Sequence, residues 1–163
     1  MLSHSRLTFL FTYDPITGMF TRKTSRGGCK IGSIAGNMDG EYLRIVIDKK
    51  IYLAHRLAWF YQTGIYPEKI DHEDHNGTNN IFTNLRNVSH SENMKNKKLH
   101  KNNTSGTIGV SWHKNLKKWM SSICVDKKTK HLGYFNDIND AIKIRKEAEI
   151  KYGFHKNHGK EKK

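Results

Sequence analysis

The chain has 163 residues, a length that suits one domain or two small ones. Its 29 Lys+Arg against 15 Asp+Glu give a formal net charge of +14 at pH 7, and the sequence pI is near 9.8. This basic balance leads us to expect a polyanionic partner, most commonly nucleic acid. A basic protein whose charge serves solubility alone is the alternative, and charge by itself leaves it open.

Composition also argues against several classes of protein. No run of about 18 apolar residues is present, so we expect no transmembrane helix. The apolar patch at 7–11 is short and is followed by no small-residue cleavage site, which disfavours a signal peptide. Cys29 and Cys124 are too few for a disulfide framework or a four-ligand zinc site. We expect a cytosolic protein with no membrane or protein partner, in the bacterial host cytoplasm if a phage encodes it.

The N-terminal part combines short strands with one helix. Asp14-Pro15 and Gly18 indicate a tight turn after the apolar patch, and Gly64 is a typical helix stop. The predicted elements are strands at 19–22, 41–47 and 51–53 and a helix at 54–63.

Three kinds of residue in this sequence have simple structural interpretations. His55 heads an apolar helix, and we expect it to be buried and hydrogen-bonded. Arg56 can pair with a carboxylate or reach a phosphate, and the sequence leaves both open. The tryptophans are expected in cores: Trp59, Trp112 and Trp119.

Residues 70–96 contain the most informative pattern. Asp71 and His72 are adjacent on a short predicted strand, a polar loop follows, and a second strand at 85–88 leads to a helix that carries Asn93. A carboxylate and an amide oxygen make a sparse site for a hard cation such as Mg²⁺, which keeps several of its waters. The imidazole of His72 can deprotonate a water for attack on phosphorus.

This segment resembles the HNH nucleases of ββα-metal fold, in particular the phage and intron-encoded homing endonucleases. The spacing of twelve residues from His72 to Asn84 and nine from Asn84 to Asn93 matches the variant of the motif that ends in Asn. The resemblance covers roughly residues 13–96. It implies His72 as general base, Asp71 and Asn93 as metal ligands and Asn84 as the residue that orients His72. Many members carry a final histidine instead of Asn93, so Mg²⁺, with Mn²⁺ as a substitute, is favoured over zinc.

A second module follows, with predicted strands at 108–112, 119–125 and 131–135 and a helix to about 152. Its motifs resemble the plant APETALA2/ethylene-response DNA-binding domain: Ser105 to Trp112, Lys118-Trp119 and Leu132 to Phe135. The resemblance implies a three-stranded sheet on one helix, with the open sheet face in the major groove of DNA. The expected DNA contacts there are Ser111, His113, Lys118, Ser122, Cys124 and His131. Arginines that the family uses are replaced, which weakens the case for direct base readout.

The segment between the modules is polar and basic. Lys95, Lys97, Lys98 and Lys101 are predicted to contact DNA phosphates. The expected fold class is therefore α+β, an N-terminal ββα-metal nuclease domain followed by a three-stranded antiparallel sheet plus one helix. The expected divisions are a nuclease domain with its β-rich lead-in at 1–96, a linker at 97–104, an APETALA2-like domain at 105–152 and a disordered basic tail at 153–163.

Taken together, these patterns predict a Mg²⁺-dependent endonuclease of the HNH homing type that cuts double-stranded DNA. The alternative is a sequence-reading DNA-binding regulator with an inactive nuclease module. The intact set of Asp71, His72, Asn84 and Asn93 argues against that alternative. An RNA-binding protein is less favoured, because no Gly-Phe-x-Phe type of motif is present.

Overall fold

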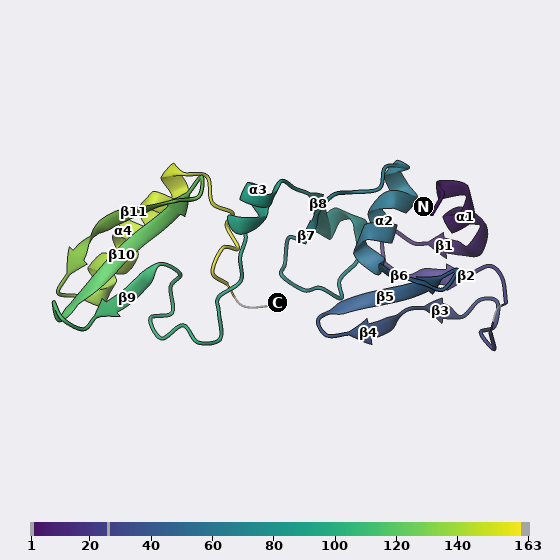
Figure 1. Ribbon diagram of the computed structural model, residues 1–163, viewed down its shortest axis with the longest axis horizontal. Helices are drawn as coiled ribbons and strands as arrows, with labels where there is room; N and C mark the ends of the chain where they lie inside the picture. The colour runs from purple at the N-terminus through teal and green to yellow at the C-terminus, as the bar shows by residue number, and fades with distance from the viewer. Residues whose placement is uncertain (1, 26, 161–163) are drawn as a thin grey trace. The chain divides into compact units, whose positions relative to one another are not determined.

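The computed structural model describes residues 2–25 and 27–160. They form two compact units, Met1–Ser89 and His90–Lys162, which are described separately below (Figure 1). The division falls before the predicted boundary at residue 96, because the C-terminal segment binds the start of the presumed linker. The backbone N–H of His155 donates to the Lys95 carbonyl at 3.0 Å, and that of Gly159 donates to the Lys97 carbonyl at 2.8 Å. Within the described ranges, no helix has the length and apolar character to cross a membrane.

The first unit is a mixture of small antiparallel sheets and short helices. Its strands pair in the orders β1-β2-β3, β4-β5-β6 and β7-β8. The elements are α1 (His4–Leu10), β1 (Phe11–Tyr13), β2 (Phe20–Arg22), β3 (Ile34–Ala35), β4 (Asn37–Asp39), β5 (Tyr42–Ile47), β6 (Lys50–Leu53), α2 (Ala54–Thr63), β7 (Ile70–His72), the 3₁₀ turn η1 (Phe82–Asn84) and β8 (Leu85–Asn87).

The predicted helix at 54–63 and the hairpin before it are confirmed. Gly64 ends α2 in the left-handed conformation at φ 71°, and its N–H donates to the Phe60 carbonyl. Asp48 and Lys49 both have positive φ, 48° and 64°, which is the backbone of a two-residue hairpin turn between β5 and β6. This tight connection fixes the strand register that brings β6 directly into α2.

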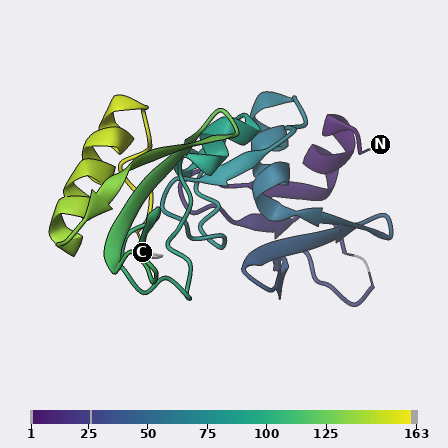
Figure 2. The same ribbon diagram turned by 60° about the vertical axis from the view of Figure 1, so that its left-hand side comes forward.

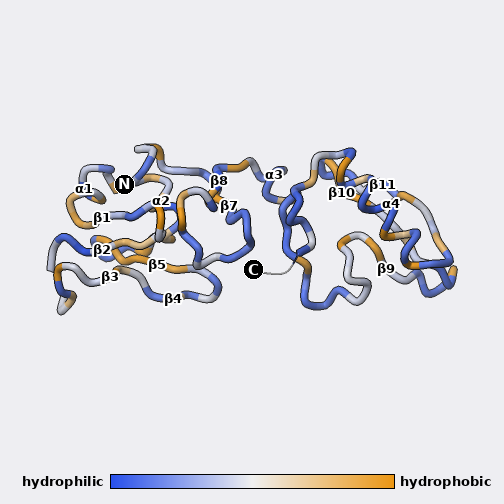
Figure 3. The backbone as a smooth tube through the Cα atoms, turned by 180° about the vertical axis from the view of Figure 1, so that it is seen from behind, coloured by the Kyte–Doolittle hydropathy of each residue, from blue (hydrophilic) through white to orange (hydrophobic). Residues whose placement is uncertain are grey.

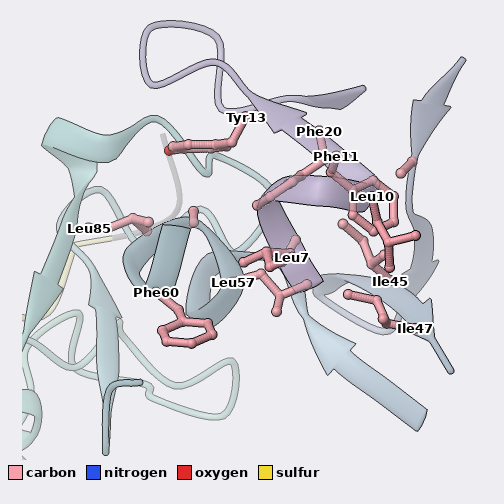
Figure 4. Packing of buried hydrophobic residues seen from close by; sticks show 13 residues of the cluster. Leu7, Leu10, Phe11, Tyr13, Phe20, Ile45, Ile47, Leu57, Phe60 and Leu85 are labelled. Carbon is pink, nitrogen blue, oxygen red and sulfur yellow. The ribbon is translucent and has the colours of Figure 1, made fainter. Parts of the chain in front are cut away.

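The core of the first unit lies between α1, α2 and the sheets. Phe20 is 1% exposed, and Leu7 and Leu57 are fully buried (Figure 4). The rings of Tyr13 and Phe20 lie 4.8 Å apart between centroids, and Figure 3 shows hydrophobic stretches along α1 and β5. This core anchors α2, whose first turn carries His55, and thereby holds one wall of the candidate site.

The second unit contains a three-stranded antiparallel sheet in the order β9-β10-β11 and one long helix, as predicted. Ile123 and Val125 of the sheet pack against Ala148 of the helix, and the helix lies along one face of the sheet (Figures 1 and 2). Asp137 caps the helix by accepting from the N–H of Asn139. The elements are α3 (His90–Met94), β9 (Val110–His113), β10 (Lys118–Val125), β11 (Lys128–Phe135) and α4 (Ile138–Lys151).

One expectation for the C-terminal part differs from the structure. The segment predicted as a disordered tail is ordered up to residue 160, because Phe154 packs against the hydrophobic cluster and His158 is 4% exposed; residues 161–163 lie outside the described residues. The inner face of α4 also buries Arg145 and Glu149, which form an ion pair at 3.1 Å. Arg145 further donates to the Ser122 carbonyl at 2.8 Å, so its charge is bonded on both sides.

Candidate active site

Asp71 and His72 lie at the end of β7, where that strand pairs with β8. In this register Asp71 is opposite Arg86 and His72 is opposite Leu85. Successive side chains on a strand point to opposite faces, so His72 turns toward the core with Leu85, while Asp71 forms an ion pair with Arg86 on the other face. These two adjacent residues thus place a carboxylate and an imidazole on the two faces of one strand end.

The ring of His72 is enclosed by three side chains from three different elements. His72 is 5% exposed, and its Nε2 lies 3.3 Å from Oδ1 of Asn80. The ring of His55 meets it edge-on with centroids 4.9 Å apart, and the ring of Tyr42 lies 6.0 Å away. Burial lowers the pKa of His72, and Asn80, Asp74 and Asp71 oppose this in part. The imidazole is therefore favoured in its neutral form, which is the form that can accept a proton.

The loop after His72 is held by a network of amide and carboxylate bonds. Asn84 donates to Oδ1 of Asp74 at 3.0 Å and to the Asn79 carbonyl at 2.9 Å, and its Oδ1 accepts from the N–H of Asp74. Asn79 donates to Oδ2 of Asp74 at 2.7 Å. Burial alone raises the pKa of Asp74, but the bonds from Asn76, Asn79 and Asn84 outweigh burial and hold that pKa below its usual range. Asp74 is therefore an ionised loop anchor.

Asn84 was expected to orient His72, and the described contacts divide that task between two residues. The side chain of Asn84 bonds the loop, whereas the amide that meets the His72 ring belongs to Asn80. Sequence reasoning missed Asn80, because it stands in a run of asparagines whose members look alike. Its burial, 3% exposed in a polar loop, distinguishes it only in the structure.

Glycines allow the loop to pack closely on the rest of the unit. A Cβ on Gly77 would lie 2.3 Å from the Glu41 carbonyl oxygen and 2.9 Å from the Tyr42 ring. Gly77 therefore lets the loop approach the start of β5, which supplies Tyr42 to the site.

The expected metal ligands are oxygen donors of the right chemistry for a hard cation. Asp71 offers a carboxylate that is 11% exposed at its side chain, and Asn93, on α3 in the second unit, offers an amide oxygen. Mg²⁺ accepts such oxygens while it keeps waters of its own, so the residue types fit. Among the described residues, no group of three or more His, Cys, Asp and Glu is placed to hold a metal ion.

The two residues at the head of α2 have structural roles. His55 is 5% exposed, and the expectation that it is buried is confirmed. Burial, the nearby His72 and the charge of Arg56 lower the pKa of His55 to about 3. Arg56 donates to the Pro67 carbonyl at 2.8 Å and lies over the Tyr66 ring at 4.7 Å, so its guanidinium packs against the segment after α2.

In the second unit, the predicted DNA-contact residues of the sheet lie mostly on the face opposite α4. Val110, Ser121 and Ile123 are buried, and the alternation of strand side chains turns Ser111 and Ser122 the other way. Tyr134 lies between two predicted contacts, with its ring 5.4 Å from that of His113 and 4.4 Å from that of His131. This aromatic row was not predicted.

The remaining residues that were predicted to contact DNA differ in their solvent exposure. Lys118 and Cys124 are exposed, and so are Lys97, Lys98 and Lys101. Lys95 instead donates to the Tyr152 carbonyl at 2.9 Å and lies over the Phe154 ring, which ties it into the second unit. Trp112 was expected in a core but is 46% exposed, and it stacks edge-on against Trp119 at 5.3 Å.

One comparison with known proteins matches the segment that contains the candidate site. A sequence model of the family described as HNH endonuclease matches residues 52–95, a range that includes Asp71, His72, Asn84 and Asn93. Protein 3.8 of Escherichia phage T7 is 36% identical over 85 residues, which are 49% of this chain and 70% of that protein. No solved structure matches the chain. The chain is thus a homologue of phage T7 protein 3.8 that contains an HNH endonuclease domain at residues 52–95.

Proposed function

We propose that the protein is a Mg²⁺-dependent endonuclease of the homing type that hydrolyses phosphodiester bonds in double-stranded DNA. The observation that carries this proposal is the neutral, enclosed imidazole of His72 at a strand end whose opposite face carries the adjacent carboxylate of Asp71. A buried neutral imidazole is a competent general base near pH 7, and an adjacent carboxylate is a ligand for a hard cation.

In this mechanism His72 accepts a proton from the attacking water. Asp71 and Asn93 would hold the cation through oxygen atoms, and Asn84 keeps the loop after His72 in place through Asp74. The bound cation would neutralise the extra negative charge of the pentavalent phosphorane-like transition state and of the leaving oxygen. Arg86, paired with Asp71, holds that carboxylate in a fixed orientation.

The second unit is proposed to bind the DNA on which the first unit acts. Its support is the row of His113, Tyr134 and His131 on the sheet face opposite α4, together with the exposed lysines of the segment before β9. Such a surface combines aromatic and cationic groups that suit DNA. The likeness to an APETALA2-type domain remains part of this proposal, as does the host cytoplasm as the place of action.

The first test is cleavage of a supercoiled plasmid by the full chain with Mg²⁺, with a chelator as the control. His72→Ala should bind DNA normally and lower the cleavage rate by about 10²- to 10⁴-fold, the usual contribution of a general base. His4→Ala, an exposed histidine on α1, should cleave like the original protein. Equal loss of binding and cleavage in His72→Ala would contradict its role, and absence of cleavage by the original protein would favour a DNA-binding regulator.

The homing interpretation has its own test. A homing enzyme should be encoded inside an intron or between phage genes and should cut an allele that lacks its own gene. If the gene lies in another setting, or if the protein cuts no such allele, the homing interpretation is wrong and the protein is an HNH endonuclease of a different kind.

A further inference from the structure

We propose that Asn80 is a positioning residue that fixes the tautomer of His72, so that Nδ1 is the ring nitrogen that accepts the proton from water. This inference rests on the proposed role of His72 as general base. It names a residue outside the set that the sequence motif identifies.

The argument begins with the atoms that meet. Oδ1 of Asn80 lies 3.3 Å from Nε2 of His72. An amide oxygen can only accept a hydrogen bond, so Nε2 must carry the hydrogen. A neutral imidazole carries one ring hydrogen, which leaves Nδ1 as the basic nitrogen.

The backbone of Asn80 is held in place by β1, by the turn that follows β1 and by its own loop. Its carbonyl accepts from the hydroxyl of Tyr13 at 2.7 Å, and its N–H donates to the Thr78 carbonyl at 3.1 Å. Gly18 packs directly on its backbone: a Cβ there would lie 2.5 Å from the Asn80 carbonyl carbon. The turn between β1 and β2 therefore fixes Asn80 before any substrate binds.

The surroundings of the His72 ring oppose the alternative orientation. A flip of the ring would place a carbon where Nε2 now meets the amide, and the rings of His55 and Tyr42 lie against the His72 ring in its present position. Both His72 and Asn80 are buried, so water cannot readily replace the lost hydrogen bond. If the side chain of Asn80 only filled space, an apolar residue of the same size could replace it without changing the tautomer of His72. This expectation can be tested.

The direct test is ¹⁵N NMR of the histidine side chains in the full chain without DNA or metal. The original protein should show His72 as the neutral Nε2–H tautomer. Asn80→Leu, which keeps the size and removes the acceptor, should shift His72 toward a mixture of tautomers. His158, buried in the second unit, gives an internal control whose signal should stay unchanged. A His72 signal of the Nδ1–H form in the original protein would overturn the inference, and that result needs no variant to fold.

Cleavage kinetics give a second readout. Asn80→Leu should lower kcat by about 10- to 100-fold, as the loss of a supporting partner commonly does, with an unchanged KM for DNA. Asn80→Asp keeps an acceptor oxygen and adds a negative charge, which raises the pKa of His72. Its activity should therefore recover at high pH, with the acid limb of the pH profile moved to higher pH. If both variants lose activity alike with no shift of that limb, Asn80 has only a packing role.

The two experiments separate this inference from the proposed function. If the original protein does not cut DNA but shows the Nε2–H form, the proposed function fails and the role of Asn80 in fixing the tautomer survives. If it cuts DNA while His72 is in the Nδ1–H form, the endonuclease function stands and Asn80 is not the positioning residue.

Discussion

At the scale of single residues, the site depends on two imidazoles that are both kept neutral. His55 and His72 meet edge-on in a buried pocket of the first unit. Protonation of either would place a cation in a poorly solvated setting and beside the other ring. The same burial that prepares His72 to accept a proton therefore makes the first unit sensitive to acid.

We predict that acid destabilises the protein partly through His55. Its pKa is about 3 in the folded protein and about 6.5 in an unfolded chain, so the unfolded state binds the proton first as pH falls. The stabilisation is complete above pH 6.5 and is lost as pH falls toward 3. Between pH 7 and pH 5 this one group should cost about 2 kcal/mol of unfolding free energy.

Urea unfolding at the two pH values measures this loss. His55→Phe, which keeps a ring, should lose about 2 kcal/mol less than the original protein on acidification. His131→Gln, at an exposed position on β11, should lose as much as the original protein. An equal loss in His55→Phe and the original protein would show that His55 is not the acid-sensitive group.

Asp71 gives a prediction about metal dependence. Asp71→Asn keeps the size but removes the negative charge, so the Mg²⁺ concentration for half-maximal cleavage should rise by about tenfold or more. Asp39→Asn is the matched control, because Asp39 also pairs with an arginine of the same unit, Arg44, at 3.1 Å. A Mg²⁺ requirement that is unchanged in Asp71→Asn, or equally raised in both variants, would show that Asp71 is not a ligand.

The sequence predicted the motif residues but not the contacts between them. Asp71, His72 and Asn84 were identified by order and spacing, which a strand–loop–strand unit preserves. Asn80 was missed because its role depends on Tyr13 and Gly18, about 60 residues earlier in the chain, which hold it from another sheet. Long-range packing of this kind leaves no local pattern.

At the scale of elements, local signals were reliable where turn chemistry was strong. Gly64 ended α2 as predicted, and β10 and β11 were predicted with a turn between them. The turn is tighter than expected, because Asp126 and Lys127 both adopt positive φ and let β11 begin at Lys128. The short strands β3 and β4 carry too few alternating residues to be predicted.

The C-terminal segment was misjudged because its composition, rich in Lys, Gly and His, resembles a solvated tail. The composition of a segment describes its average polarity, whereas the packing of a single aromatic side chain can hold the segment against a hydrophobic cluster. Phe154 joins the cluster of Ile123, Val125 and Ala148, and backbone bonds then pair the segment with residues 95–99.

We therefore predict that Phe154→Ala destabilises the second unit by about 1–3 kcal/mol, a value for a partly buried aromatic ring. Ile150→Ala is the control, because Ile150 is 82% exposed on the outer side of α4; it should change stability by less than about 0.5 kcal/mol. Thermal unfolding followed by circular dichroism compares the two. A Phe154→Ala protein as stable as Ile150→Ala would restore the view of this segment as a loose tail.

At the scale of the whole molecule, net charge is the property that follows most directly from the sequence. The chain carries 29 Lys+Arg against 15 Asp+Glu, so its own carboxylates cannot neutralise the net charge of +14. Excess positive charge on two small units destabilises each of them by self-repulsion, and a polyanion relieves that repulsion. DNA binding by both units is thus expected to depend steeply on salt.

The last prediction concerns where that salt dependence arises. Each lysine that contacts a phosphate releases a counterion, so its removal should reduce the slope of log affinity against log salt by about 1. We expect this for Lys97→Gln and Lys101→Gln, which are exposed in the segment before β9. Lys143→Gln, exposed on α4, which packs on the opposite face of the sheet from His113 and His131, should leave the slope unchanged. Fluorescence anisotropy with a DNA duplex and no divalent metal, from 50 to 300 mM salt (roughly the range in which counterion release dominates), measures all three. A similar decrease for all three variants would mean that the charge acts diffusely and that the segment before β9 is not a phosphate-contacting track.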